Sequence, residues 1–205
     1  MSNEVKTKEK VDMDPQYIIK LTVTLFVTCV IVAGLLGLVN SVTAGPIAEI
    51  NKAKTETAMK AVVADPENST FSEALELTDD MTAAASSAGA SVTEAYEVQV
   101  GGASAGYALK IVSSGSQGNI EMMVGVDAEG TVTGVSIVNN SETSGIGSRV
   151  MSNENGVLDQ FKGMSAADAP LTVGKNVDAI TGATVSSKGV TTGVNAALAV
   201  AGVMG

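Results

Sequence analysis

The chain has 205 residues, a formal net charge of −10, one Cys, no His and no Trp. An acidic chain is unsuited to binding nucleic acid, and a single cysteine excludes an intrachain disulfide, a cysteine-bound iron–sulfur cluster and a thiolate zinc site. The absence of histidine excludes a Ser-His-Asp hydrolase. We therefore expect the chemistry of this protein to come from a bound cofactor.

An uncharged apolar run occupies residues 21–39. It would form a helix of about 28 Å at 1.5 Å per residue, which spans the hydrocarbon core of a bilayer. Tyr17 and Lys20 lie where an interfacial ring and a snorkelling amine belong. The sequence thus predicts an uncleaved transmembrane helix over residues 17–40. A signal peptide cleaved after Ala44 is the competing interpretation, but its apolar region should have only about 7–15 residues.

Charge near this run indicates its orientation. The first 20 residues contain four lysines and four acidic residues, so the whole net charge lies beyond the apolar run. Lysines favour the cytoplasmic side of a membrane, although Lys52, Lys54 and Lys60 follow the run at some distance. We predict a cytoplasmic tail over residues 1–16 and a C-terminal domain on the extracytoplasmic side of the cell membrane.

Residues 41–90 are expected to be a helical connecting region. Gly45 and Pro46 are predicted to end the membrane helix, with a second helix over residues 47–63 and a short one near residues 72–77.

From residue 91 the pattern changes to β-forming residues between Gly, Ser and Asn turns. Strands are expected at residues 92–100, 106–112, 120–126 and 131–138, with a hairpin turn at 127–130. Met122 and Met123 are interpreted as packing residues. An amphipathic helix is expected from residue 188 to 203. The predicted fold class is therefore α+β: one transmembrane helix, then an antiparallel-sheet domain with flanking helices over residues 91–205.

Hydroxyl side chains gather in the run DAITGATVSS at residues 178–187, just before the last predicted helix. Gly182 and Ala183 allow close approach of the backbone, and unpaired N–H groups at the start of a helix favour an anion such as phosphate. The alternative is that Ser186 or Ser187 simply caps the helix.

The order of residues in this run resembles the flavinylation motif Asp-x-x-(Ser/Thr)-Gly-Ala-(Thr/Ser)-x-(Ser/Thr). In proteins with that motif a flavin transferase joins FMN to the second hydroxyl residue through a phosphoester. The corresponding residue of this chain is Thr184.

A second run, NNSETSGIG at residues 139–147, resembles the His-x-Glu-Thr-Pro-Gly-Leu-Gly signature of the same flavin domain. Asn140 stands where the family often has His, and Ser144 where it has Pro. The two glycines permit a tight loop that approaches a flat ligand closely.

Residues 95–200 thus resemble the FMN-binding domain shared by the G subunit of the Rnf electron-transport complex and the C subunit of the sodium-translocating NADH:quinone reductase. The resemblance implies covalent FMN on Thr184 and a motif residue, Asp178, that serves the transferase reaction. The remaining residues expected around the cofactor are Thr181, Gly182, Ala183 and Ser186 at the phosphate, and Glu142, Thr143, Gly145 and Ile146 along the ribityl chain and ring.

The short chain is more similar to the Rnf protein. That resemblance implies a membrane-anchored flavoprotein subunit of a translocase, which relays electrons between ferredoxin and NAD and couples this transfer to Na+ or H+ movement. Its implied partners are the flavin transferase, a pair of membrane Fe–S subunits and a second subunit with covalent FMN. The alternatives are the quinone-reductase protein, a stand-alone extracytoplasmic FMN carrier, or a cofactor-free anchored scaffold with unmodified Thr184.

Overall fold

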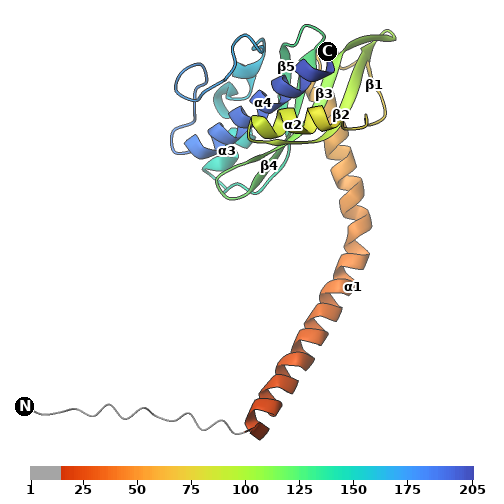
Figure 1. The fold of residues 1–205 in the computed structure, drawn as a ribbon, viewed down its shortest axis with the longest axis vertical. Coiled ribbons are helices and arrows are strands. Elements are labelled where there is room, and N and C mark those ends of the chain that lie inside the picture. Colours follow the sequence, from red (N-terminus) through yellow and green to blue (C-terminus); the bar gives the residue numbers. More distant parts are fainter. Residues whose placement is uncertain (1–14) are drawn as a thin grey trace, which may run out of the picture. The chain divides into compact units, whose positions relative to one another are not determined.

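The computed structural model describes residues 15–205 (Figure 1). The tail predicted over residues 1–16 therefore lies outside the described residues except for its last two positions. The chain divides into two compact units, one ending at Ile50 and one spanning Asn51–Gly205.

Helix α1 (Pro15–Val62) is one continuous helix of 48 residues. Within residues 15–205 it is the helix long and apolar enough to cross a membrane. Threonine hydroxyls in the apolar part donate to backbone carbonyls one turn earlier, for example from Thr22 to Ile18 at 2.9 Å and from Thr24 to Lys20 at 2.8 Å. The hydroxyl groups are therefore hydrogen-bonded within the helix and can lie in an apolar surrounding.

The prediction that Gly45 and Pro46 end this helix is wrong, because Pro46 lies inside α1. A proline removes one backbone hydrogen bond, a local cost of about 3 kcal/mol. Ala48, Glu49 and Lys52 after the proline are good helix formers, and the residues near Val62 are held by packing in the second unit. The helix therefore continues through the proline.

Five antiparallel strands form one sheet in the order β1-β2-β3-β4-β5. Their bounds are β1 (Ser69–Phe71), β2 (Ser91–Val100), β3 (Ala103–Ser114), β4 (Asn119–Asp127) and β5 (Val132–Asn140). The four longer strands and the turn at residues 127–130 were predicted correctly. In that turn the Asp127 carboxylate accepts the N–H groups of Glu129 at 3.1 Å and Thr131 at 2.7 Å.

Strand β1 was not expected, and the short helix predicted near residues 72–77 is wrong. That segment is held against β2 by hydrogen bonds from Ser72 N to Glu97 O (3.0 Å) and from Leu75 N to Ala95 O (2.8 Å). The helix begins later, as α2 (Asp79–Ser87), where the Thr78 hydroxyl accepts the N–H of Met81.

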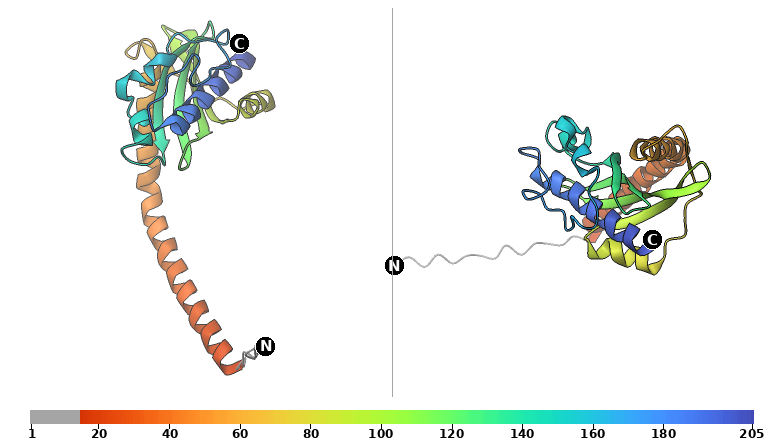
Figure 2. Two further views of the ribbon diagram at one scale, coloured as in Figure 1. Left: turned by 90° about the vertical axis from the view of Figure 1, so that its left-hand side faces the viewer. Right: turned by 90° about the horizontal axis from the view of Figure 1, so that it is seen from above.

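Helices α2 and α4 (Thr184–Met204) cover one face of the sheet (Figures 1 and 2). The core between them contains alternate aliphatic residues of the strands, such as Leu109, Ile111 and Met122, packed against the small residues of α4. Gly193 of α4 lies where an added Cβ would come 2.6 Å from the sulfur of Met122, so this glycine lets the helix approach the sheet closely. Met122 and Met123 are both fully buried, as predicted.

The opposite face of the sheet packs against the last turns of α1. Gly125 and Gly134 are directly opposite each other on β4 and β5, and a Cβ on either would collide with the backbone of Val62. The hydroxyl of Thr133 donates to the carbonyl of Val62. Met59 and Val62 are buried in a second cluster with Met123. These contacts fix the end of α1 to the sheet.

Between β5 and α4 the chain forms mainly short helical turns: α3 (Gly147–Met151), η1 (Glu154–Gly156) and η2 (Asp159–Phe161). Phe161 is buried in the core under β5. This region and the turn between β3 and β4 form the surroundings of α4's first turn.

Candidate functional site

Thr184 is the first residue of α4, and its side chain is exposed. The helix begins four residues before the predicted residue 188. The N-cap position is Ala183, which supplies no side-chain hydrogen bond, so the alternative in which Ser186 or Ser187 caps the helix is wrong. The first N–H groups of an α-helix have no partner within the helix, and here no capping side chain takes them. Thr184 therefore lies where an anion is favoured.

A pocket of about 320 Å³ opens beside Thr184. Three segments line it: the turn between β3 and β4, the loop after β5, and the start of α4. The lining residues are Ser116, Gln117, Glu142, Thr143, Ile146, Gly147, Gly182, Ala183, Thr184, Val185 and Ser186. Both sequence motifs thus meet in one pocket.

Two aliphatic side chains give this pocket an apolar surface. Ile146 is 53% exposed and Val185 is 56% exposed, whereas most large apolar side chains of the second unit are buried. One comes from each motif, and both line the pocket that contains the Thr184 hydroxyl. The pocket therefore combines apolar contact for a flat ring with a hydroxyl and free N–H groups for a phosphate.

The Glu142 carboxylate joins the three segments of the pocket. One oxygen accepts the N–H groups of Ser116 at 2.6 Å and Gln117 at 3.4 Å, and the other accepts the hydroxyl of Ser186 at 2.6 Å. We call this set of hydrogen bonds the Glu142 bridge. Ser116 is 26 residues and Ser186 is 44 residues away from Glu142 in the sequence.

Glycines leave room for this bridge. An added Cβ on Gly147 would collide with the Glu142 carboxylate and lie 2.9 Å from the Ser186 hydroxyl oxygen. An added Cβ on Gly115 would collide with the other carboxylate oxygen. Gly147 is the last residue of the run that resembles the family signature. A larger residue at this position would displace the Glu142 carboxylate, which explains why a glycine stands there.

The predicted phosphate residues do not all point to the pocket in the same way. Ser186 is buried, and its hydroxyl is used by Glu142. Gly182 has φ +85°, a left-handed conformation that favours glycine. Gly145 lies in the loop outside the lining of the pocket, where its N–H donates to the hydroxyl of Ser148 at 2.8 Å.

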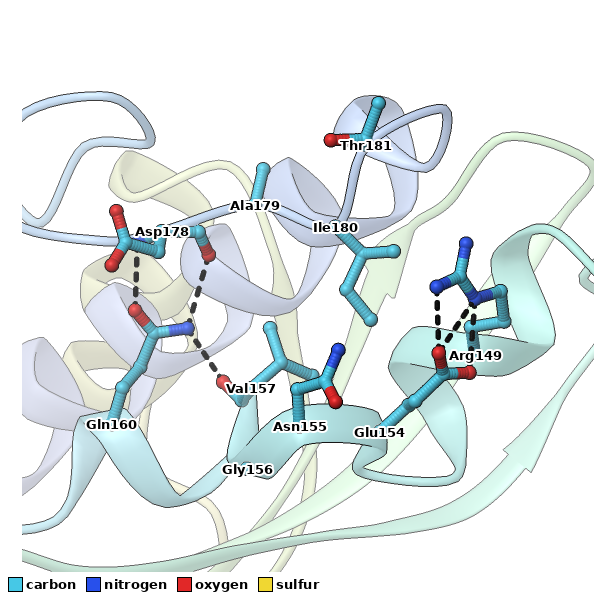
Figure 3. Close-up of a pocket in the computed structure, with 10 residues that line it drawn as sticks. All are labelled: Arg149, Glu154, Asn155, Gly156, Val157, Gln160, Asp178, Ala179, Ile180 and Thr181. Atoms are coloured by element: carbon cyan, nitrogen blue, oxygen red, sulfur yellow. Dashed lines mark hydrogen bonds and ion pairs between the residues drawn. The ribbon is translucent and has the colours of Figure 1, made fainter.

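Thr181 and Asp178 line a second pocket, of about 390 Å³, which contains the first part of the motif (Figure 3). Gln160 holds the start of the motif there. Its amide oxygen accepts the N–H of Asp178 at 2.7 Å, and its amide nitrogen donates to the Asp178 carbonyl at 3.0 Å. The carboxylate of Asp178 is exposed and has no hydrogen bond or ion pair with another residue in the described part of the chain.

The second pocket is walled on its far side by an ion pair. The Arg149 guanidinium contacts both carboxylate oxygens of Glu154, with the shortest distance 2.6 Å (Figure 3). This pairing lowers the pKa of Glu154 and raises the pKa of Arg149. Because both groups are paired with each other, the charge of this wall is locally balanced.

Four residues that line the first pocket were not among those expected around the cofactor: Ser116, Gln117, Gly147 and Val185. Ser116 and Gln117 lie in a plain Gly-flanked turn, GSQG at residues 115–118, which has no chemical signature. Val185 occupies the unspecified position of the flavinylation motif. Only the three-dimensional arrangement brings Ser116 and Gln117 to Thr184, whereas Val185 is its neighbour in the chain.

The family model of the FMN-binding domain matches residues 115–199. This range begins at the turn between β3 and β4 and ends in α4, so it includes every residue that lines the first pocket. A long apolar helix followed by this domain defines a class: the protein is a membrane-associated FMN flavoprotein of electron transport.

Relatives identify the family within that class. The chain is 36% identical to the G subunit of the Na(+)-translocating ferredoxin:NAD(+) oxidoreductase complex of Acetobacterium woodii, over 96% of this chain and 97% of that protein. It is 32% identical to the G subunit of the ion-translocating oxidoreductase complex of Methanosarcina acetivorans, over 90% of this chain and 95% of that protein. The chain belongs to the family of G subunits of the Rnf ion-translocating oxidoreductase complexes.

A third relative matches a shorter region. The G subunit of the proton-translocating ferredoxin:NAD(+) oxidoreductase complex of Clostridium ljungdahlii is 38% identical over 50% of this chain and 57% of that protein. The names of the relatives thus include both coupling ions. The family places this chain in a multi-subunit complex whose other subunits are its partners.

Proposed function

We propose that Thr184 carries FMN through a phosphoester and that this flavin relays electrons between neighbouring redox centres of the complex. The observation that carries the proposal is the position of Thr184: it is an exposed hydroxyl at the uncapped start of α4, inside a pocket formed by both family motifs. When bound, FMN accepts one or two electrons, so it can connect one-electron and two-electron carriers.

Residues of the chain have distinct tasks in this proposal. The N–H groups of the first turn of α4 stabilise the phosphate charge, and Ile146 and Val185 provide apolar contact for the ring. Thr143 and Gly182 line the same pocket. Lys188 lies one turn after Thr184 on an exposed face and makes no ion pair within residues 15–205, so its charge is available to the phosphodiester.

Asp178 and Thr181 have another task, because they face the neighbouring pocket. The carboxylate of Asp178 is exposed and unpaired in the described part of the chain, which leaves it accessible to a flavin transferase. Gln160 fixes the backbone of Asp178 and thereby the shape in which the motif is presented.

Intact mass of the protein purified from its native membrane tests the attachment, together with flavin fluorescence after denaturing electrophoresis. We expect a mass increase of one FMN less one water, lost in Thr184→Ala and kept in Thr192→Ala, a control on the same helix. Thr184→Ser should retain the flavin because it retains the hydroxyl. Unmodified native protein would overturn the proposal.

We also propose that electrons pass between ferredoxin and NAD in the whole complex, with coupled Na+ or H+ transport. The names of the A. woodii and C. ljungdahlii relatives support this activity. Ferredoxin-dependent NAD reduction by membranes should fall to background when Thr184→Ala replaces the native chain. Retained activity would show that the flavin of this chain lies off the electron path.

The remaining proposal concerns orientation: the N-terminus is cytoplasmic and the flavin domain extracytoplasmic. Cys29, the one cysteine of the chain, lies in the apolar part of α1. A Cys29→Ser, Glu129→Cys variant therefore carries a single thiol, on the exposed turn after β4. A membrane-impermeant maleimide should label it in intact cells. If the thiol is labelled only after lysis, the flavin domain lies on the cytoplasmic side and the proposed orientation is wrong.

A further inference from the structure

The two oxygens of the Glu142 carboxylate are already occupied by groups of the chain itself. Ser116 N–H and the Ser186 hydroxyl each lie 2.6 Å from one oxygen. Hydrogen bonds of this length to a charged acceptor are among the stronger ones in proteins. Together with Gln117 N–H, these donors use three of about four acceptor positions of the carboxylate, so little of its acceptor capacity is left for the flavin.

The elements that Glu142 joins are the three walls of the pocket. Ser116 belongs to the turn between β3 and β4, Glu142 to the loop after β5, and Ser186 to the first turn of α4. Ser186 is two residues from Thr184, and a shift in its position moves the helix start. The bridge therefore sets the position of Thr184 relative to the other two walls.

Close packing around the bridge supports this role. Gly115 and Gly147 both leave no room for a side chain because the Glu142 carboxylate fills that space. The N–H of Glu142 itself donates to the Asn140 side-chain oxygen at 3.1 Å, which orients the residue from behind. The network is only partly buried, but both carboxylate oxygens have partners within the chain, which favours one geometry.

We infer that Glu142 is a positioning residue: its carboxylate holds the start of α4 and the β3–β4 turn in the geometry that accepts FMN at Thr184, and it does not bind the flavin itself. The inference rests on the proposed function. It assigns to Glu142 a role that differs from the flavin contact expected from the sequence.

Three substitutions separate positioning from binding. Glu142→Ala removes both acceptors, whereas Glu142→Gln keeps an oxygen for Ser116 N–H and an N–H that can donate to the Ser186 oxygen. Ser186→Ala removes one bond from the other side and keeps the helix. Glu121→Ala is the control, because Glu121 is a partly buried glutamate of the adjacent strand β4 with no hydrogen bond to the pocket.

The first readout is the rate of flavin attachment to the full-length chain, followed by intact mass with the transferase saturating. Glu142→Ala should slow attachment by on the order of tenfold or more, since small displacements of a reacting group cost this much. Glu142→Gln should restore most of the rate, and Glu121→Ala should leave it unchanged. Normal attachment in Glu142→Ala would overturn the inference.

The second readout is amide hydrogen exchange in a Thr184→Ala background, which has no flavin. There Glu142→Ala should speed exchange of the Ser116 amide and of the amides at the start of α4, and Ser186→Ala combined with it should add little more. If exchange in this background is unchanged while flavin attachment is lost, Glu142 acts as a flavin ligand and the inference fails. This readout needs no flavin. It therefore tests the positioning role of Glu142 separately from the proposal that FMN is attached to Thr184.

Discussion

Glu94, Tyr96 and Lys110 form a small charged network on the sheet face that packs against α1. The Glu94 carboxylate accepts the Tyr96 hydroxyl at 2.6 Å and the Lys110 ammonium at 2.9 Å. Burial raises the pKa of Glu94, but the hydrogen bonds of Tyr96 and Lys110 and the lysine charge outweigh burial and hold this pKa below its ordinary value of 4.5. Burial and the contact with Glu94 raise the pKa of Tyr96 to about 12.

This network makes stability depend on pH on the acid side. A lowered pKa means that the folded protein favours ionised Glu94, so the contribution is present above pH 4.5 and is lost as the pH falls through the lower folded value. We expect Lys110→Met to reduce the free energy of unfolding at pH 7 by about 1 kcal/mol. Urea denaturation should show this difference shrinking below pH 4.5, and an equal difference at both pH values would contradict the assignment.

Residue-level prediction from sequence is most specific where a local motif carries the information. Thr184 was singled out by the motif around it, and the structure places it at a helix start beside a pocket. The partners of Glu142 were beyond such reasoning, because Ser186 is 44 residues away and its bond depends on how α4 returns to the sheet. From the sequence alone, a glutamate that contacts a ligand cannot be distinguished from one that holds a loop in place by hydrogen bonds.

Among the elements, the sheet and α1 meet through two glycines. Gly134→Ala would place a Cβ 2.9 Å from Val62 Cα, and backbone on both sides leaves little freedom to adjust. We expect a loss of about 1–3 kcal/mol in the free energy of unfolding. Gly202→Ala is the matched control, since nothing lies within 4 Å of its added Cβ and alanine favours a helix. Similar melting temperatures for the two variants would argue against tight packing of α1.

Helix α4 provides a second comparison between glycines. An added Cβ would lie 2.6 Å from the Ser114 carbonyl oxygen at Gly189 and 2.6 Å from the Met122 sulfur at Gly193. A carbonyl in a strand cannot move away easily, whereas a methionine side chain adapts. Gly189→Ala should therefore cost about 2–3 kcal/mol and Gly193→Ala about 1 kcal/mol or less. Thermal unfolding checks the order, and a reversed order would show that Met122 is held more rigidly than the strand.

Elements were predicted well where periodicity is strong and poorly where tertiary contacts decide. Strands β2 to β5 follow the runs of β-forming residues, which alternate or cluster between turns. Strand β1 has three residues and exists through its pairing with the end of β2. The passage of α1 through Pro46 shows that one lost hydrogen bond does not end a long helix whose last turns are held by packing.

For the molecule as a whole, the unit boundary predicts how the chain can be shortened. The unit that begins at Asn51 includes the last turns of α1, where Ala58, Met59 and Val62 are buried. A fragment of residues 51–205 should fold and remain soluble. A fragment of residues 64–205 loses these contacts and exposes Met123, so we expect it to lose several kcal/mol of stability or to aggregate. Circular dichroism and gel filtration of the two fragments test this prediction. Equal stability of the two fragments would show that the last turns of α1 do not contribute to the fold of the domain.

The order of the sheet has a consequence for the time course of biosynthesis. Strands β1 to β5 each pair with their neighbour in sequence, so the sheet can assemble hairpin by hairpin as the chain is made. Helix α4 follows all five strands in the chain, and it covers the sheet made before it. The hydroxyl that we propose for flavin attachment is thus presented only after the whole sheet has been synthesised. A flavin on Thr184 would mark a chain whose sheet is complete, and chains stalled before α4 would enter assembly colourless.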